Sequence, residues 1–217
     1  MATLQELQND VTAIFNKIEV AISIEELKAI QNLKEFPYLK EFDIDEKKYP
    51  RLDISLTIEE VKSLKKEGLL ESNGSISLNL AKNNALSPLE KLLFSILWKN
   101  TDLGKEKHII DGVIGRDDKK DSLVFYYFGR HLANKSNPII DQHVIRAWLF
   151  LQASKDKSRN FEKILSKKNI VSTDKEVCEK YIDWQNQHKL KKTEPIEFTY
   201  YVDRLLFALG KYLKIAT

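Results

Sequence analysis

The chain has 217 residues, of which 42% are hydrophobic and 31% are charged, a balance that is ordinary for a globular protein. Its 7 glycines and 5 prolines leave few obligatory turns, which favours helices over a β-sandwich or barrel. The sequence contains no apolar run long enough to span a membrane, and its start lacks the pattern of a secretory signal. We therefore expect a soluble, cytoplasmic protein.

Cysteine content and charge limit the possible cofactors and partners. The single cysteine, Cys178, excludes a disulfide within the chain and a four-cysteine iron–sulfur cluster, and no Cys/His spacing typical of zinc occurs. We expect neither a metal nor another cofactor. Residues 99–168 contain 15 Lys and Arg against 9 Asp and Glu, whereas residues 1–98 contain 12 against 16. A nucleic-acid backbone would suit this positive segment, although a solvated lysine-rich face would also explain it.

Apolar residues at helical spacing predict helices along most of the chain. They are expected over residues 3–22, 23–33, 57–68, 87–100, 122–134, 141–152, 161–165, 173–186 and from 194 onward. Thr57 with Glu60, and Ser87 with Glu90, have the spacing of a capping box. Leu89, Leu92, Leu93, Ile96 and Leu97 are expected to form the buried stripe of the helix that begins at Ser87.

One segment has a different pattern. Residues 69–80 alternate around Asn73-Gly74, which predicts a β-hairpin; a helix followed by a hairpin also resembles the end of a winged-helix domain. We expect a mainly α-helical protein with this one small hairpin. Its predicted parts are an N-terminal region, residues 1–86, and a domain, residues 87–217, although one continuous globule is also compatible with the pattern.

The most apolar and aromatic stretch, residues 122–152, also contains an aspartate, two histidines and two arginines. Asp141 precedes the helix expected at residues 141–152, and aspartate is a favoured N-cap residue. The simplest interpretation is that Asp141 only caps this helix. A carboxylate held at a helix start can also face a ligand that the helix amides contact.

The segment Pro138-Ile-Ile-Asp-Gln-His-Val-Ile-Arg146 resembles the apolar-Asp-x-His-Val-x-Arg segment of the helix-hairpin-helix DNA glycosylase superfamily. That superfamily includes endonuclease III-type and 8-oxoguanine-type enzymes, whose two halves enclose a cleft. The resemblance implies a two-lobed, helical DNA-repair protein that binds duplex DNA and excises a damaged base. It also implies that Asp141 is the catalytic carboxylate. The likeness could extend over residues 87–152.

The family's hairpin sequence, Leu-Pro-Gly-Val-Gly, is present here only in altered form. The corresponding segment, Asp111-Gly-Val-Ile-Gly-Arg116, has its glycines at a different spacing and lacks the proline. The resemblance implies that the amides around Gly112 and Gly115, together with Arg116, hold a DNA phosphate.

The position of the lysine that gives some family members lyase activity is open between two alignments. If the helix at residues 122–134 follows the hairpin, Lys119 or Lys120 lies near that position, and its amine could form a Schiff base with the sugar. Aligning residues 128–134 with the family's Val-Gly-Arg-Lys-Thr-Ala-Asn places His131 there instead. We prefer the first alignment because the second leaves too few residues before Asp141 for the family's helix.

Further residues are expected to contact DNA or an extruded base. The candidate DNA contacts are Lys99, Arg130, His143 and Arg146. The candidate walls of a base pocket are Trp98, Tyr127 and Trp148, although most aromatic residues of this kind lie in a core.

Three other interpretations fit the same residues. A non-catalytic nucleic-acid-binding module of this fold would bind duplexes without releasing a base. In a helical structural or partner-binding protein, Asp141 would cap its helix and pair with Arg130 or Arg146. A hydrolase built on His108, His131 or His143 has the least support, because no Ser or Cys nucleophile stands at a recognisable turn.

Overall fold

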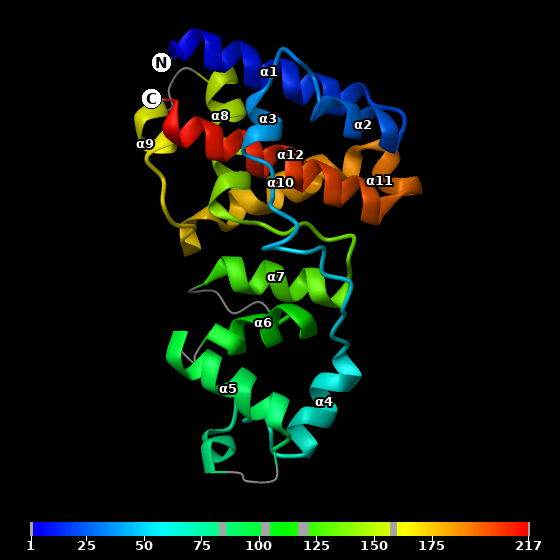
Figure 1. Ribbon diagram of the computed structural model, residues 1–217, viewed down its shortest axis with the longest axis vertical. Helices are drawn as coiled ribbons and strands as arrows, with labels where there is room; N and C mark the ends of the chain where they lie inside the picture. Colours follow the sequence, from blue (N-terminus) through cyan, green and yellow to red (C-terminus); the bar gives the residue numbers. More distant parts are fainter. Residues whose placement is uncertain (1, 83–85, 101–104, 117–121, 157–159, 217) are drawn as a thin grey trace. The chain divides into compact units, whose positions relative to one another are not determined.

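The computed structural model describes residues 2–82, 86–100, 105–116, 122–156 and 160–216. Within these ranges the chain forms twelve α-helices and two short 3-10 helices (Figure 1). The α-helices are α1 (Leu4–Val20), α2 (Ile24–Ile30), α3 (Tyr38–Glu41), α4 (Ile58–Lys66), α5 (Pro88–Asn100), α6 (Lys105–Ile114), α7 (Leu123–Ala133), α8 (Gln142–Lys155), α9 (Phe161–Leu165), α10 (Lys175–Gln187), α11 (Lys189–Thr193) and α12 (Pro195–Ile215). The 3-10 helices are η1 (Leu78–Lys82) and η2 (Ser172–Asp174). The mainly α-helical prediction is confirmed.

The predicted capping boxes are formed. At α4 the Thr57 hydroxyl accepts from the amide of Glu60 at 3.2 Å, and the Glu60 carboxylate accepts from the amide of Thr57 at 2.7 Å. At α5 the pair Ser87 and Glu90 makes the same two bonds at 3.3 and 2.7 Å. These bonds satisfy amides that a helix start leaves without a backbone partner, so both helices begin where the sequence predicts.

The predicted hairpin at residues 69–80 is wrong, because the described part of the chain contains no strand there. Gly74 does make a tight turn, with a φ of 93°, but only an isolated antiparallel bridge between Leu70 and Ile76 closes it. The chain enters η1 at Leu78, so no residues remain to extend the ladder on that side. An isolated two-stranded pair is marginal, and among the described residues no third strand supports it.

The chain divides into two compact units. Unit 1 comprises Met1–Asp53 and Ser136–Thr217, and unit 2 comprises Ile54–Lys135. Residue 86, at which the sequence predicts the end of the N-terminal region, falls inside unit 2. Within unit 1, α1 packs against α8 and α2 packs against α12, so segments from both ends of the chain form this unit.

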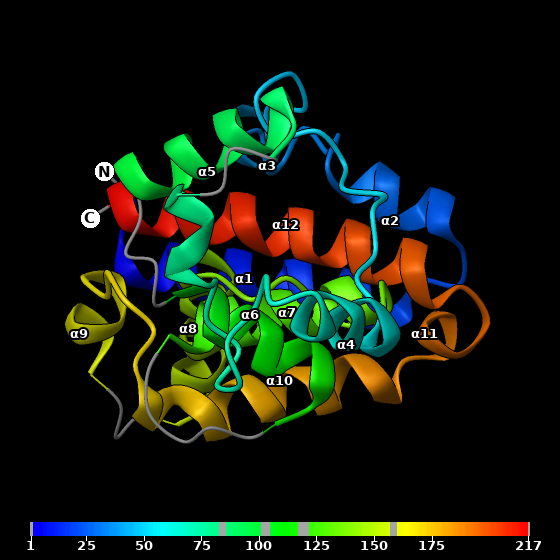
Figure 2. The same ribbon diagram turned by 90° about the horizontal axis from the view of Figure 1, so that it is seen from below.

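Unit 1 is built around α12. Helices α8, α3, α2 and α11 all pack against it, and α12 runs through the middle of the unit in both views (Figures 1 and 2). Ten of its residues are buried, which matches the apolar stripe expected for this helix. The core beside α8 is aromatic, with the rings of Phe15, Trp148, Tyr181 and Trp184 in mutual contact.

Unit 2 contains a closely packed pair of helices, α6 and α7. Two glycines lie at the contact: a Cβ on Gly112 would come within 2.0 Å of the Tyr126 carbonyl oxygen, and one on Gly129 within 2.0 Å of the Ile109 carbonyl oxygen. Any side chain at either position would overlap backbone of the other helix. The two glycines therefore permit the close approach of α6 and α7.

The apolar stripe of α5 is not buried as predicted. Leu89, Leu92, Leu93 and Ile96 are between 47% and 62% exposed, and the side chain of Leu97 lies outside the described residues. Helical periodicity identifies an apolar face but does not specify what covers it.

No described helix of the chain is both long and apolar enough to cross a bilayer.

Candidate functional site

The Asp141 carboxylate is held at the N-terminus of α8. Its Oδ1 atom accepts hydrogen bonds from the amides of His143 and Val144, both at 2.8 Å. The backbone of Asp141 is extended, with φ −121° and ψ 178°, which is typical of an N-cap residue. Both bonds use one oxygen, so the cap itself does not engage Oδ2. The predicted N-cap is confirmed.

The protonation of Asp141 depends on opposing effects. Burial raises the pKa of this carboxyl above its usual 3.8. The amide bonds from Val144 and His143 and the positive charge of Arg146 act in the opposite direction by stabilising the carboxylate. The site therefore combines a partly desolvated acid with donors that favour its charged form.

Arg146 lies in the core and not on a DNA-facing surface. Its side chain is 0% exposed. The guanidinium donates to the Gly210 carbonyl at 2.9 Å and to the Lys167 carbonyl, and it contacts Nδ1 of His143 at 2.9 Å. Arg146 was expected to contact DNA, but here its side chain is buried in unit 1 and two of its nitrogens donate to backbone carbonyls.

The contact with Arg146 also determines the state of His143. A guanidinium has only donors, so Nδ1 must accept, and the ring proton of neutral His143 lies on Nε2. Burial lowers the pKa of His143, which favours this neutral form. The half-buried ring packs edge-on against Phe207 of α12, with centroids 5.0 Å apart. His143 thus links the start of α8 to α12.

Gly210 makes this arrangement possible, and its role was not predicted. It lies within α12, where a Cβ would come within 1.9 Å of the His143 carbonyl oxygen. The close crossing of α8 and α12 brings the Gly210 carbonyl to Arg146. A glycine inside an apolar helical stripe was the available signal, but the sequence does not show which helix approaches it.

The expected phosphate-binding amides at residues 112–116 are already paired. Gly112 belongs to α6, which ends at Ile114, and the next residue, Gly115, has a φ of 69°. The Gly115 amide donates to the Gly112 carbonyl at 3.3 Å, and the Arg116 amide donates to the Asp111 carbonyl at 2.8 Å. These two amides are used at the end of α6, and a phosphate contact there stays a prediction. The Arg116 side chain is 49% exposed and lies 3.6 Å from the Asp111 carboxylate.

The other expected DNA-binding residues of unit 2 differ in their exposure to solvent. Lys99 is exposed on α5. Arg130 is partly exposed on α7, and its guanidinium lies 5.9 Å from the ring centroid of Tyr127. Lys119 and Lys120, the candidates for the lyase lysine, lie outside the described residues, as does the side chain of Trp98.

The two described base-pocket candidates lie in hydrophobic cores. Tyr127 is 1% exposed and belongs to unit 2, whereas Trp148 is 6% exposed and belongs to unit 1. Trp148 contacts three other aromatic rings, so its surface is used for packing. Neither residue forms an open pocket wall within its own unit.

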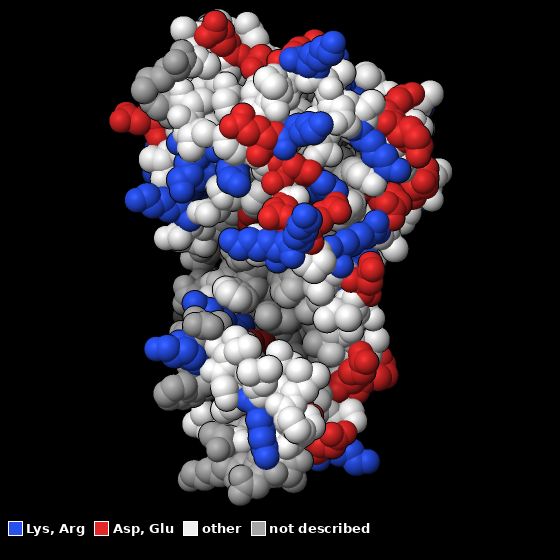
Figure 3. Space-filling view, viewed as in Figure 1, with Lys and Arg blue, Asp and Glu red and all other residues white. Residues whose placement is uncertain are grey.

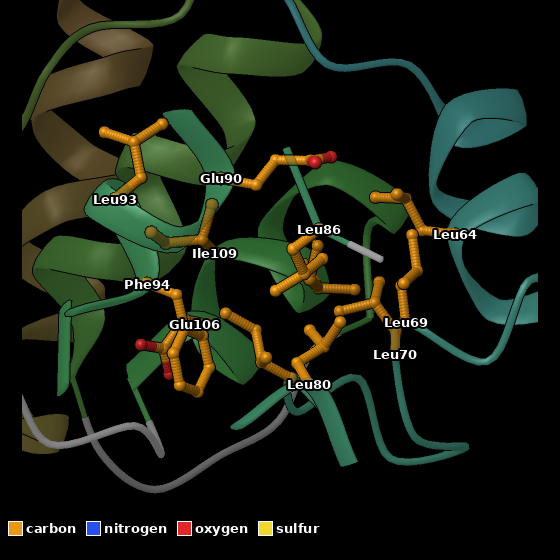
Figure 4. A pocket seen from close by; sticks show the side chains of 12 residues that line it. Leu64, Leu69, Leu70, Leu80, Leu86, Glu90, Leu93, Phe94, Glu106 and Ile109 are labelled. Atoms are coloured by element: carbon orange, nitrogen blue, oxygen red, sulfur yellow. The ribbon is translucent and has the colours of Figure 1, made fainter. Parts of the chain in front are cut away.

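A cavity of about 320 Å³ lies within unit 2 (Figure 4). Leucine and isoleucine side chains of α4, α5 and α6 and of residues 69–86 make up most of its wall, with the carboxylates of Glu90 and Glu106 at the edge. Neither Tyr127 nor Asp141 is among the described residues that line it. The cavity is therefore separate from the Asp141 site in its residues and in its chemistry.

No group of His, Cys, Asp and Glu side chains that could hold a metal ion occurs within the described ranges. No protein-family model, curated protein or solved structure matches the chain. The function of the Asp141 site must therefore be argued from its own residues.

Proposed function

We propose that the protein is a glycosylase-like DNA-repair enzyme that binds duplex DNA and excises a damaged base, with Asp141 as its catalytic carboxylate. The observation that carries the proposal is the geometry of this group. Two amides hold a single oxygen of a partly desolvated carboxylate at 2.8 Å, at the start of a helix that packs against α12.

The chemistry of base excision suits such a carboxylate. Cleavage of the glycosidic bond develops positive charge on the sugar, and a fixed anion stabilises that charge without having to reorganise during the reaction. The cap uses Oδ1 and leaves Oδ2 outside its two bonds. The proposal needs the ionised form of Asp141, which the amides of Val144 and His143 and the positive charge of Arg146 favour against the opposing effect of burial on the pKa.

The charge distribution also supports a nucleic-acid partner. The excess of Lys and Arg over Asp and Glu is concentrated in residues 99–168, which include Asp141. In Figure 3, several lysine and arginine side chains lie together below the place of α9, and others alternate with aspartate and glutamate over the rest of this face of unit 1. A phosphate backbone is the partner that such a grouping fits.

The two-unit organisation is also compatible with the proposal. The resemblance to helix-hairpin-helix glycosylases implies two lobes, and the chain forms a continuous unit 2 between the two segments of unit 1. Asp141 follows closely after Ser136, where the chain re-enters unit 1. Lyase chemistry would need Lys119 or Lys120 in addition, and it belongs to the same proposal.

The test is single-turnover base release from duplexes that contain 8-oxoguanine, uracil, an alkylated purine or an abasic site. Asp141→Asn and Asp141→Ser are compared with the wild type, because asparagine and serine can still cap α8 while the charge is lost. We expect release from one of these duplexes to fall by roughly 100-fold or more in both variants. Their free energy of unfolding should change by only about 1 kcal/mol or less.

Other outcomes separate the rival interpretations. Salt-dependent binding of duplexes without base release from any of them would indicate a non-catalytic nucleic-acid-binding module. If the wild type neither binds nor releases a base, Asp141 serves only as a helix cap, and the proposal is overturned.

A further inference from the structure

The segment that leads into Asp141 contacts a buried cluster of polar side chains. Residues 136–140 have no regular secondary structure, and the cluster comes from α10, α11 and α12. We call these side chains the anchor cluster; each is at most 9% exposed, and they are Tyr181, Gln185, Lys191, Thr199 and Asp203.

Asp203 is the centre of the anchor cluster. Its Oδ1 accepts from the Tyr181 hydroxyl at 2.8 Å and from the Gln185 amide nitrogen at 3.1 Å. The same Gln185 nitrogen lies 2.6 Å from the Tyr181 hydroxyl oxygen. These contacts leave Oδ2 of Asp203 directed at a different partner, the backbone amide of Ile139, which donates to it at 2.7 Å.

The anchor cluster also holds the beginning of the segment. The Lys191 ammonium contacts the Ser136 carbonyl, and the Thr199 hydroxyl lies 3.0 Å from the same carbonyl and 2.7 Å from the Pro195 carbonyl, so its one proton is shared between them. Lys191 connects the two halves of the cluster, since it also contacts Thr199 and lies 3.4 Å from the Gln185 amide oxygen. The backbone is therefore held at Ser136 and at Ile139.

These contacts restrict where Asp141 can lie. Ile139 is two residues before Asp141, and consecutive Cα atoms are only about 3.8 Å apart. The intervening residue, Ile140, is 0% exposed, so it is held by packing as well. The Asp141 carboxylate is thus constrained by the anchor cluster on the preceding side and by the α8 amides on the following side.

A polar cluster in this place needs an explanation beyond stability. Burying five polar side chains costs desolvation, and apolar residues of similar volume often stabilise a core equally well. What apolar residues cannot supply is a directed hydrogen bond to the backbone at Ser136 and Ile139. We infer that the anchor cluster, with Asp203 at its centre, positions the catalytic carboxylate of Asp141; its effect on catalysis rests on the proposed function.

The test compares two tyrosine variants that remove the same chemical group. Tyr181→Phe removes a hydroxyl that donates to Asp203 at 2.8 Å, and Tyr38→Phe removes one that donates to Asp10 at 3.0 Å. Both tyrosines are buried in unit 1, but Tyr38 is not in the anchor cluster. Asp203→Asn is the stronger variant, because one carbonyl oxygen cannot replace two carboxylate oxygens that accept from donors on both sides.

The first measurement is amide hydrogen exchange, which does not depend on any activity. In Tyr181→Phe we expect the amides of Ile139, His143 and Val144 to exchange roughly 3- to 10-fold faster, the effect of removing one hydrogen bond. Tyr38→Phe should leave these three amides unchanged. If they exchange at the wild-type rate in Asp203→Asn, or if all of unit 1 exchanges faster to the same extent, the positioning role is overturned.

The second measurement is single-turnover base release at saturating DNA. A positioning role predicts a rate reduced by roughly tenfold or more in Tyr181→Phe, with unchanged DNA affinity and a normal rate in Tyr38→Phe. Absence of base release by the wild type would overturn the proposed function alone, since the exchange data would still decide whether the anchor cluster holds Asp141. If Tyr181→Phe and Asp203→Asn alter amide exchange but release the base at the wild-type rate, the anchor cluster holds Asp141 without affecting catalysis, and its role in catalysis is overturned.

Discussion

At the scale of single residues, buried charged groups determine the chemistry of unit 1. Arg146 is completely buried, and Asp141 and Asp203 both hold backbone amides close to the start of α8. Each of these groups is hydrogen-bonded to backbone, which is how a folded chain makes buried charge tolerable. These side chains therefore hold the backbone around the start of α8 in place.

The ionisation of Asp203 should make stability depend on pH. Burial raises the pKa of Asp203 from its usual 3.8 to about 7, although the Tyr181 hydroxyl, the Ile139 amide, the Gln185 amide and the Lys191 ammonium all face it and favour the anion. An acid with a raised pKa in the folded state binds its proton more tightly there. It therefore contributes stability at low pH, and this contribution is lost as the pH rises through about 7.

The prediction uses Asp203→Asn, which cannot titrate at this position. Between about pH 4 and 7, the free energy of unfolding of the wild type should fall relative to that of Asp203→Asn, by at most about 1.4 kcal/mol per pH unit. Lys191, whose pKa burial lowers to about 8 while the charge of Asp203 raises it, stays protonated in the wild type over this range. Urea denaturation at several pH values measures the effect, and a difference that is constant with pH would contradict it.

At the scale of helices, glycines determine which elements can approach closely. Gly112 and Gly129 lie where α6 meets α7, and Gly210 lies where α12 meets α8. In each case a backbone atom of the neighbouring helix occupies the space that a Cβ would need. A glycine inside a helix costs about 1 kcal/mol relative to alanine, so these three positions sacrifice helix propensity for close packing.

Alanine substitutions at two glycines should show whether a glycine is needed because a side chain has no space there or because of its backbone conformation. In Gly129→Ala the new Cβ would lie 2.0 Å from the Ile109 carbonyl oxygen, and we expect a decrease of roughly 3 kcal/mol or more in the free energy of unfolding. Gly68 is the control, because it has a φ of 73° and nothing within 4 Å, so Gly68→Ala should cost only about 1 kcal/mol. Circular dichroism during urea denaturation gives both values. Equal decreases would show that α6 and α7 do not meet at Gly129.

At the scale of the whole molecule, the distribution of charge along the chain, and not its overall composition, is the feature that suits a phosphate backbone. The net charge of the chain is only +3, but the basic excess is concentrated in residues 99–168 and the acidic excess in residues 1–98. Binding to a phosphate backbone releases counterions, so the affinity should depend on the basic segment and should fall as salt concentration rises.

Paired lysine variants test this charge distribution. Lys163 and Lys168 are exposed in the basic segment, and Lys34 and Lys40 are exposed in the acidic one. Changing Lys163 and Lys168 to glutamine should weaken duplex binding and reduce the slope of log K against log salt by about 0.9 for each DNA phosphate that the protein no longer neutralises. The same change at Lys34 and Lys40 should leave the slope unaltered. Equal effects of the two pairs would mean that overall charge, and not this segment, attracts DNA.

The sequence alone determined the features that depend on neighbours along the chain. Helix content, the capping boxes at Thr57 and Ser87, and the N-cap at Asp141 were predictable, because each depends on bonds between residues at most four apart. The same local rules identified the turn at Gly74 but not the absence of strands beside it. A turn needs only a few residues, whereas strands need partners.

Only the tertiary structure decided how Asp141 is held. The bond from Ile139 to Asp203 and the bond from Arg146 to Gly210 each join residues 64 positions apart. Periodicity shows that a helix has an apolar face, as it does for α5 and α12, but it does not show that the face of α12 is covered and that of α5 is exposed. The burial of Arg146 follows from the same cause, because contacts between distant segments, and not local sequence, determine which side chains are removed from water.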